Sequence, residues 1–166
     1  KGIGGELLEA VTQEMRGQGC SFISAEIEDL EKMSLAEIKT ERASGVSTPD
    51  RTRFYQAHDF LIVGLIGEDG RFYEMPYGQA PLDEGMEPSL TLHWITRPLD
   101  EAGRKLVQEG LPVELAAAKI NEYHASWAET GPGSYTEGLL REMRELAAAH
   151  GVQRFSFRPL SAGDAA

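Results

Sequence analysis

Three residues between positions 29 and 39 are of the types that divalent-metal chemistry requires. Asp29 is followed eight positions later by Glu37-Ile38-Lys39. In an extended strand alternate side chains share a face, so Glu37 and Lys39 would point the same way. Two carboxylates can hold a hard cation, and an ammonium group beside it can offset negative charge on an attacked phosphate. The spacing therefore predicts a phosphodiester-cleaving metal site if residues 35–40 form a strand. In a helix the pattern has no such meaning.

The local sequence is compatible with both conformations. Ser34 and Glu37 have the spacing of a helix capping box, and Glu, Ala, Leu and Lys favour helices. The run Leu-Ala-Glu-Ile-Lys-Thr over residues 35–40 alternates instead with the period of two that is typical of a strand. Helix and strand both remain open for residues 21–43, and the proposed site depends on which of them forms.

The rest of the first half contains one helix and a strand pair. Residues 5–16 are predicted to be helical because their apolar side chains recur on one face. Phe60–Ile66 is almost entirely apolar and is the clearest strand prediction, as expected for a central buried strand. The remaining expected elements are a loop over 45–50, a short helix over 51–57, a turn at 68–70 and a return strand over 71–76.

The second half is predicted to be mostly helical. A loop over 78–88 and a strand over 90–96 precede helices over 99–109, 113–128 and 134–149, a strand over 152–158 and a frayed tail over 161–166. We therefore expect a single α/β domain over residues 1–160, with a mixed central sheet flanked by helices. Residues 1–77 would form its core, and 78–160 would form a helical C-terminal extension with a closing strand.

Composition limits the possible functions. The chain has 166 residues and a net charge of −11, which disfavours non-specific adhesion to nucleic acid. Basic residues are nevertheless concentrated after the motif, where Arg42, Arg51 and Arg53 could contact phosphates. A single cysteine excludes an internal disulfide and fits a reducing, cytoplasmic compartment. No apolar run has the length of a membrane-spanning helix.

The four histidines do not have the spacing of a zinc site. His58, His93, His124 and His150 are scattered along the chain. His93 lies in a predicted strand beside Trp94, where a core or edge role is more common than metal ligation. His150 closes a predicted helix, where the helix dipole favours a cation.

The order of elements resembles the PD-(D/E)xK nuclease superfamily, which includes type II restriction endonucleases and the methyl-directed mismatch-repair nuclease. The resemblance covers residues 1–77. It rests on the opening Lys1-Gly2-x-x-Gly5-x-Leu7-Leu8-Glu9, on Asp29 with Glu37-Ile-Lys39-Thr40, and on the strand His-Asp-Phe-Leu-Ile-Val that follows. A restriction-endonuclease-like fold is what the resemblance implies.

The resemblance also implies roles for individual residues. Asp29 and Glu37 would bind Mg²⁺, or Mn²⁺ in its place, together with the carbonyl oxygen of Ile38. Lys39 would orient or deprotonate the attacking water, and Glu9 would assist at the edge of the site. The implied function is a Mg²⁺-dependent DNA endonuclease, which would act as a homodimer and have no contact with membranes.

Two departures from the family pattern leave alternatives open. The usual proline before the first acidic ligand is absent, and Glu28 stands in its place. Glu26, Glu28 or Glu31 could therefore replace Asp29 as the first metal ligand. The second hypothesis for the whole chain is a non-catalytic, acidic protein-interaction domain, which could be a decayed nuclease fold.

Overall fold

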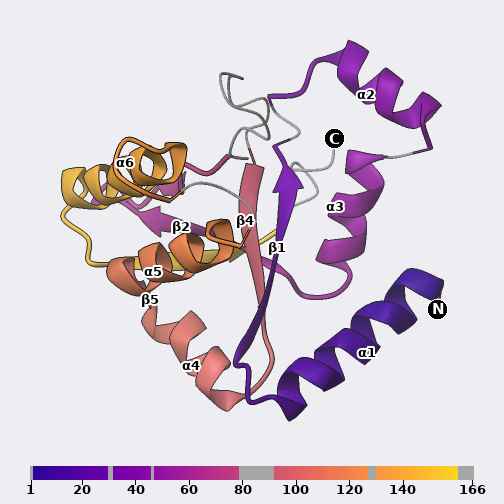
Figure 1. Cartoon of the computed structure of the whole chain (residues 1–166), viewed down its shortest axis with the longest axis horizontal. Coiled ribbons are helices and arrows are strands. Elements are labelled where there is room, and N and C mark those ends of the chain that lie inside the picture. The colour runs from indigo at the N-terminus through magenta and orange to yellow at the C-terminus, as the bar shows by residue number, and fades with distance from the viewer. Residues whose placement is uncertain (1, 30–31, 46, 79–91, 127–129, 161–166) are drawn as a thin grey trace.

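A computed structural model of the chain describes residues 2–29, 32–45, 47–78, 92–126 and 130–160. It is a mixed α/β structure in which helices lie on both sides of an antiparallel sheet (Figure 1). The described helices are α1 (Ile3–Gly17), α2 (Leu35–Ala43), α3 (Thr48–Gln56), α4 (Glu101–Glu109), α5 (Val113–His124) and α6 (Tyr135–Ala149). The described strands are β1 (Phe22–Glu28), β2 (Leu61–Ile66), β3 (Phe72–Glu74), β4 (Leu92–Pro98), β5 (Leu111–Pro112) and β6 (Arg154–Pro159).

The strand order is β1-β4-β2-β6-β5, and β3 pairs with β2 outside this path. Every described strand pair is antiparallel. The α/β class is confirmed, but the expected mixed sheet is wrong for the described strands. The C-terminal half does contain helices α4, α5 and α6, but its strands β4 and β6 both pair with β2, so it is part of the central sheet and not an extension from it. The long β1–β4 pairing joins residues about 70 positions apart, and it sets the geometry of both sites described below.

The predicted metal-binding strand is wrong, because residues 35–43 form helix α2. Ser34 caps this helix by accepting a hydrogen bond from the backbone N–H of Glu37, and the Glu37 carboxylate accepts one in return from the N–H of Ser34. None of the α2 residues is buried. Packing therefore does not oppose the local helical preference, and the capping box determines the conformation.

The strongest strand prediction is confirmed. Residues 61–66 form β2, and the four consecutive residues from Ile62 to Leu65 are buried. Helices α4, α5 and α6 lie within one to four residues of the predicted bounds. The short strand β5 was not predicted, since Gly110 and Pro112 indicate a simple break between helices. The predicted loop over 78–88 and tail over 161–166 lie almost entirely outside the described residues.

Two apolar cores lie on opposite faces of the sheet. One joins β2 and β6 to α5 and α6, and it includes Leu65, Ile120, Met143 and Phe155. The other joins β1, β2 and β4 to side chains of α1 and α3, around Ile27 and Ile95. Together the two layers hold the sheet from both sides and fix the ends of β1 and β4.

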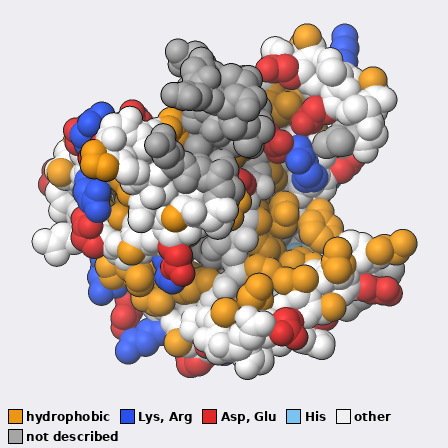
Figure 2. Space-filling model, viewed as in Figure 1, with side chains coloured by type: hydrophobic (Ala, Val, Ile, Leu, Met, Phe, Trp, Pro, Cys, Tyr) orange, Lys and Arg blue, Asp and Glu red, His pale blue; other side chains and the backbone are white. Residues whose placement is uncertain are grey.

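Apolar side chains also reach the surface. Figure 2 shows them gathered between α1 and α3, with charged side chains around the rest of this face. On α1 the side chains of Ile3 and Leu7 are 87% and 64% exposed. None of the described helices is long and apolar enough to cross a membrane.

Candidate metal centre

Three metal-ligating side chains meet at one end of the sheet, and they come from different segments. Asp29 directly follows β1, Glu74 ends β3, and His93 lies near the start of β4. The antiparallel register places His93 opposite Ile27, two residues before Asp29. Because β3 pairs with β2, it brings Glu74 to the same end. The sheet topology therefore assembles a cluster from residues that are far apart in the sequence.

The ligand atoms of the cluster are close together. One side-chain atom of each of Asp29, Glu74 and His93 lies within 4.8 Å of the others. Nε2 of His93 is 3.6 Å from a carboxylate oxygen of Asp29, and Nδ1 is 3.2 Å from one of Glu74. Asp29 and His93 are only 5% and 8% exposed. Such burial is unusual for an aspartate and requires a partner that offsets its charge.

Cations flank the cluster on two sides. Nζ of Lys32 lies 3.2 Å from the Asp29 carboxylate, and a guanidinium nitrogen of Arg158 lies 2.8 Å from the Glu74 carboxylate. The Arg158 guanidinium also lies over the ring of Phe72, 5.0 Å from its centroid. These contacts hold the two carboxylates in place, and each leaves an oxygen directed to His93.

The cluster opens into a pocket of about 540 Å³ between the sheet and α6. Asp29, Glu74 and His93 line one side, and Glu142 and Glu145 of α6 line the other. Lys32 is the one described lysine or arginine in the lining. The pocket thus combines three inward donor groups with an acidic rim, which attracts cations and repels anions.

The donor set suits a divalent metal ion. Carboxylate oxygens and an imidazole nitrogen are the usual ligands of Zn²⁺, Mn²⁺ and Fe²⁺ in proteins. Three protein ligands leave further coordination positions for water or substrate, which is typical of catalytic rather than structural sites. The pocket supplies the space for those positions.

Of the residues predicted from the sequence to form the site, Asp29 alone belongs to the cluster. Glu37 and Lys39 are exposed on α2, and residues two apart on a helix do not face each other. Ile38 lies between them, with its carbonyl group in the helix. Hydrogen bonds from the side chain and the backbone N–H of Ser34 lower the pKa of Glu37, so this carboxylate is engaged as a helix cap.

The other predicted residues lie on helices outside the cluster. Glu9 is exposed on α1 and accepts a hydrogen bond from Gln13, and Arg42 is exposed on α2. Arg53 is paired with Asp50 on the surface of α3. Arg42, Arg51 and Arg53, the three arginines predicted to contact phosphates, are not among the residues that line the pocket.

Arg51 has a structural role that the sequence did not indicate. One of its guanidinium nitrogens lies 2.8 Å from Glu28 and 3.2 Å from Glu41, and it donates to the hydroxyl of buried Thr48. Glu41 also accepts hydrogen bonds from Thr48. This network joins α2, α3 and β1, and it engages the arginine that was predicted to contact phosphate.

The sequence analysis did not identify Glu74 and His93 as candidate ligands. Glu74 is one of many glutamates in the chain, and its neighbours Tyr73 and Met75 mark only a strand. His93 had a weak signal, because a histidine inside an otherwise apolar strand needs a polar partner when it is buried. Finding that partner required the strand pairing.

No family model matches the chain, and no curated protein or solved structure matches it significantly. The relationship to the PD-(D/E)xK nucleases therefore stays a prediction.

Proposed function

We propose that the chain binds a divalent transition-metal ion at Asp29, Glu74 and His93 and uses it to activate water for hydrolysis in the adjoining pocket. The observation that supports the proposal is the meeting of three ligand atoms within 4.8 Å at the wall of an open pocket. A metal ion bound there would supply Lewis acidity and lower the pKa of a bound water. The chain's own groups would hold the metal and orient it toward the pocket.

The mixed donor set favours Mn²⁺, Zn²⁺ or Fe²⁺ over Mg²⁺. Mg²⁺ prefers oxygen ligands and retains most of its water, whereas an imidazole ligand suits transition metals. The Mg²⁺ preference expected from the sequence rested on Glu37 and a backbone carbonyl, neither of which belongs to the cluster. We therefore expect Mg²⁺ to bind more weakly than Mn²⁺ or Zn²⁺.

The pocket also bears on the class of substrate. Glu142 and Glu145 line the same pocket as the cluster, and their carboxylates would repel a phosphodiester backbone. The sequence analysis had predicted a restriction-endonuclease-like fold that cleaves DNA. That prediction and the present proposal have one metal ligand in common, Asp29. The acidic rim favours instead a neutral or cationic ester or amide.

The first test is the thermal stability of chelator-treated protein with and without added metal. A metal that binds only the folded state at a hundred times its dissociation constant stabilises it by about 2.7 kcal/mol. We expect Mn²⁺ and Zn²⁺ to raise the Tm of the wild type. The rise should be lost in Asp29→Asn, Glu74→Gln and His93→Asn, each compared with its own metal-free Tm.

Glu37→Gln is the matched control, because it makes the same chemical change at an exposed carboxylate that the sequence had placed in the site. Its metal-induced rise should equal that of the wild type. Loss of the rise in Glu37→Gln, or its retention in all three cluster variants, would show that the metal binds elsewhere. If no metal raises the Tm, the metal-site proposal is wrong. His93 would then serve only to join the carboxylates of Asp29 and Glu74, and the non-catalytic interaction domain would be favoured.

A second measurement addresses the reaction. The metal-loaded protein would be assayed with p-nitrophenyl acetate, with bis(p-nitrophenyl) phosphate and with plasmid DNA. We expect ester hydrolysis that chelation abolishes and that Glu74→Gln reduces by at least about a hundredfold. Metal-dependent cleavage of DNA but not of the ester would contradict the argument from the acidic rim and support the nuclease prediction.

A further inference from the structure

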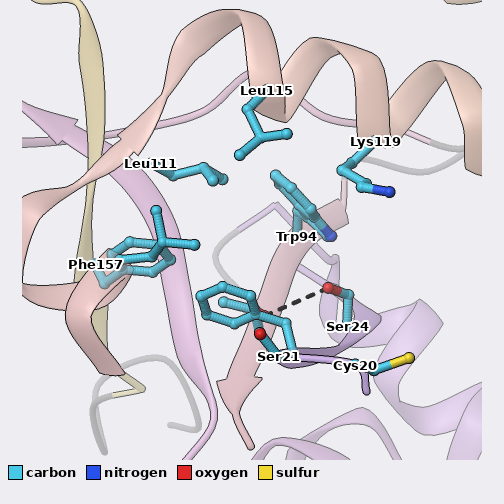
Figure 3. A pocket seen from close by; sticks show the side chains of 11 residues that line it. Cys20, Ser21, Ser24, Trp94, Leu111, Leu115, Lys119 and Phe157 are labelled. Carbon is cyan, nitrogen blue, oxygen red and sulfur yellow. Dashed lines mark hydrogen bonds between the residues drawn. The ribbon is translucent and has the colours of Figure 1, made fainter. Parts of the chain in front are cut away.

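A second hollow lies between the sheet and α5. Two adjoining pockets of about 370 and 520 Å³ share four lining residues, which are Phe22, Ser24, Trp94 and Lys119. We call this continuous space the aromatic groove. Figure 3 shows its apolar half, where Leu111, Leu115, Phe157 and Trp94 lie around one space. The groove follows β1 and β4 from this apolar half to a polar end.

Two carboxylates line the polar end, those of Glu26 and Glu122, and that of Glu122 is paired with Lys119. Glu26 lies opposite Trp94 in the β1–β4 pairing and lines the groove. Its carboxylate accepts a hydrogen bond from the hydroxyl of Tyr77. The oxygen of Tyr77 is also 3.3 Å from Nε2 of His124, whose Nδ1 is 3.0 Å from the hydroxyl of Thr136. This buried chain of polar groups fixes the orientation of the Glu26 carboxylate.

The charge of Glu26 has no cationic partner among the described residues. Lys119 also lines the groove, but its ammonium group lies 2.8 Å from the carboxylate of Glu122. A carboxylate can accept about four hydrogen bonds, and the Tyr77 hydroxyl supplies one. Burial and the hydrogen bond to Glu26 both raise the pKa of Tyr77, so its hydroxyl remains a donor and does not add charge. The polar end therefore carries a net negative charge beside apolar surface.

Four aromatic side chains line the same pocket as the Glu26 carboxylate. Trp94, Tyr77, Tyr123 and Phe22 line the same part of the groove. The faces of aromatic rings attract cations, and the attraction strengthens where water is excluded. A carboxylate among aromatic rings is thus complementary to an ammonium group.

We propose that the aromatic groove binds an amphipathic organic cation, which is a protonated amine attached to an aryl or alkyl group. The ammonium group donates to Glu26 and lies against the rings around it. The apolar part extends toward Leu111, Leu115 and Phe157, where the pocket wall is mainly hydrophobic. Charge complementarity thus fixes the direction of the ligand in the groove.

The test uses three small probes of similar size and different charge: phenethylamine, phenethyl alcohol and hydrocinnamate. The chain has two tryptophans, at positions 94 and 127, so Trp127→Phe leaves Trp94 as the one indole reporter. Trp94 fluorescence would be titrated with each probe in this background. We expect saturable binding of the amine that is at least about tenfold tighter than that of the alcohol, with the anion weakest.

Glu26→Gln is the decisive variant, because its amide oxygen can still accept the hydrogen bond from Tyr77 and the fold is retained. It should lower the affinity for the amine to within about twofold of that for the alcohol, whose own affinity should not change. Glu114→Gln is the control, since this exposed carboxylate on α5 is paired with Arg144 and lies outside the groove lining. It should leave all three affinities unchanged.

Four results would overturn the proposal: no saturable binding, equal affinities for the three probes, tightest binding of hydrocinnamate, or an unchanged amine affinity in Glu26→Gln. Tightest binding of the anion that is lost in Lys119→Met would assign the groove to carboxylates. None of these measurements uses metal, so the result is independent of the Asp29–Glu74–His93 centre.

Discussion

The hydroxyl oxygen of Tyr77 lies 3.3 Å from Nε2 of His124, although the two residues are 47 positions apart. Their rings are also in contact, with centroids 5.9 Å apart. His124 is completely buried at the end of α5, and Thr136 at the start of α6 holds its other ring nitrogen. This pair therefore joins the segment after β3 to the two C-terminal helices through polar groups inside the core.

Burial of His124 makes stability depend on pH. Removal from water lowers the pKa of His124 below the ordinary value of 6.5, because the charged imidazolium is the form that loses most hydration. In the unfolded chain the same ring binds a proton as the pH falls below 6.5, so the unfolded state holds more protons in that range. The stabilisation is complete above pH 6.5 and is lost progressively as the pH falls toward the folded-state pKa.

The prediction can be checked by urea denaturation of the wild type and His124→Gln between pH 5 and pH 8. The free energy of unfolding of the wild type should exceed that of the variant by a margin that shrinks below pH 6.5. One proton limits the slope of this margin to about 1.4 kcal/mol per pH unit. A margin that is constant over the whole range would show that His124 does not change its protonation on unfolding.

Two helical glycines should respond in opposite ways to replacement by alanine. A Cβ at Gly103 in α4 would clash with the carbonyl oxygen of Ser21. That carbonyl accepts a hydrogen bond from the N–H of Leu99 and cannot move freely. Gly103→Ala should therefore lower the free energy of unfolding by about 2 kcal/mol or more. Gly138 in α6 has no atom within 4 Å of such a Cβ, so Gly138→Ala should raise it by about 0.5–1 kcal/mol.

Chemical denaturation of both variants measures the difference directly. Because the two substitutions are chemically identical and both lie in helices, propensity cancels from the comparison. Equal changes in stability would mean that α4 does not lie close to Ser21.

Two serine caps provide a second matched pair. Ser34 caps α2 and Ser134 caps α6, each by accepting a hydrogen bond at 3.2 Å from the backbone N–H three residues later. Helix α6 places Leu139, Leu140, Met143 and Ala147 in the core, whereas α2 buries none of its residues. Loss of the α6 cap thus weakens the whole fold, but α2 can unfold locally.

We expect Ser134→Ala to lower the global free energy of unfolding by about 1 kcal/mol, and Ser34→Ala by less than about 0.5 kcal/mol. Amide hydrogen exchange should locate the effect of Ser34→Ala in residues 35–43 alone. Similar global losses for both variants would indicate that α2 unfolds together with the core.

The secondary structure could be predicted from the sequence in segments where every local signal, such as apolar pattern and capping, favoured the same conformation. The short, β-branched apolar run Leu61–Ile66, which ends before a turn, favours a buried strand, and the cap at Ser134 with the apolar stripe after it specifies α6. At 35–40 two weak signals of opposite sign were present. The capping box of Ser34 and Glu37 outweighs the alternation, because no buried face rewards a strand there.

The candidate site was less predictable, because its ligands are joined by pairing between distant strands. Asp29 was predicted from its spacing to Glu37 and Lys39 and from the resemblance to the nuclease superfamily. Its partner His93 lies 64 positions later and is positioned by the β1–β4 register, which the hydrophobic pattern of either strand does not specify. The sequence therefore supplied a nearby but incorrect partner, Glu37, in place of the two ligands that the sheet provides.

If the proposed metal ion binds at Asp29, Lys32 would compete with it for the carboxylate, so removal of Lys32 should tighten metal binding. Its ammonium nitrogen is 3.2 Å from the carboxylate, and its side chain is 61% exposed. At that exposure the attraction between two unit charges about 4 Å apart is about 1 kcal/mol in water. Lys32→Met should therefore increase the affinity for Mn²⁺ by about fivefold at low ionic strength, measured by competition with a metal-sensitive dye. Added salt should reduce the gain, because it screens exposed charges.

Lys39→Met is the control for this effect, since it removes the same charge from an exposed site on α2 that does not line the pocket. We expect it to leave the affinity for Mn²⁺ unchanged. A gain of similar size in both variants would reflect net charge alone, because the chain is already strongly acidic. Weaker binding in Lys32→Met would show that the lysine supports the metal site. A gain in Mn²⁺ affinity in Lys32→Met but not in Lys39→Met, which is lost in the double variant Lys32→Met/Asp29→Asn, would place the metal at the Asp29 carboxylate.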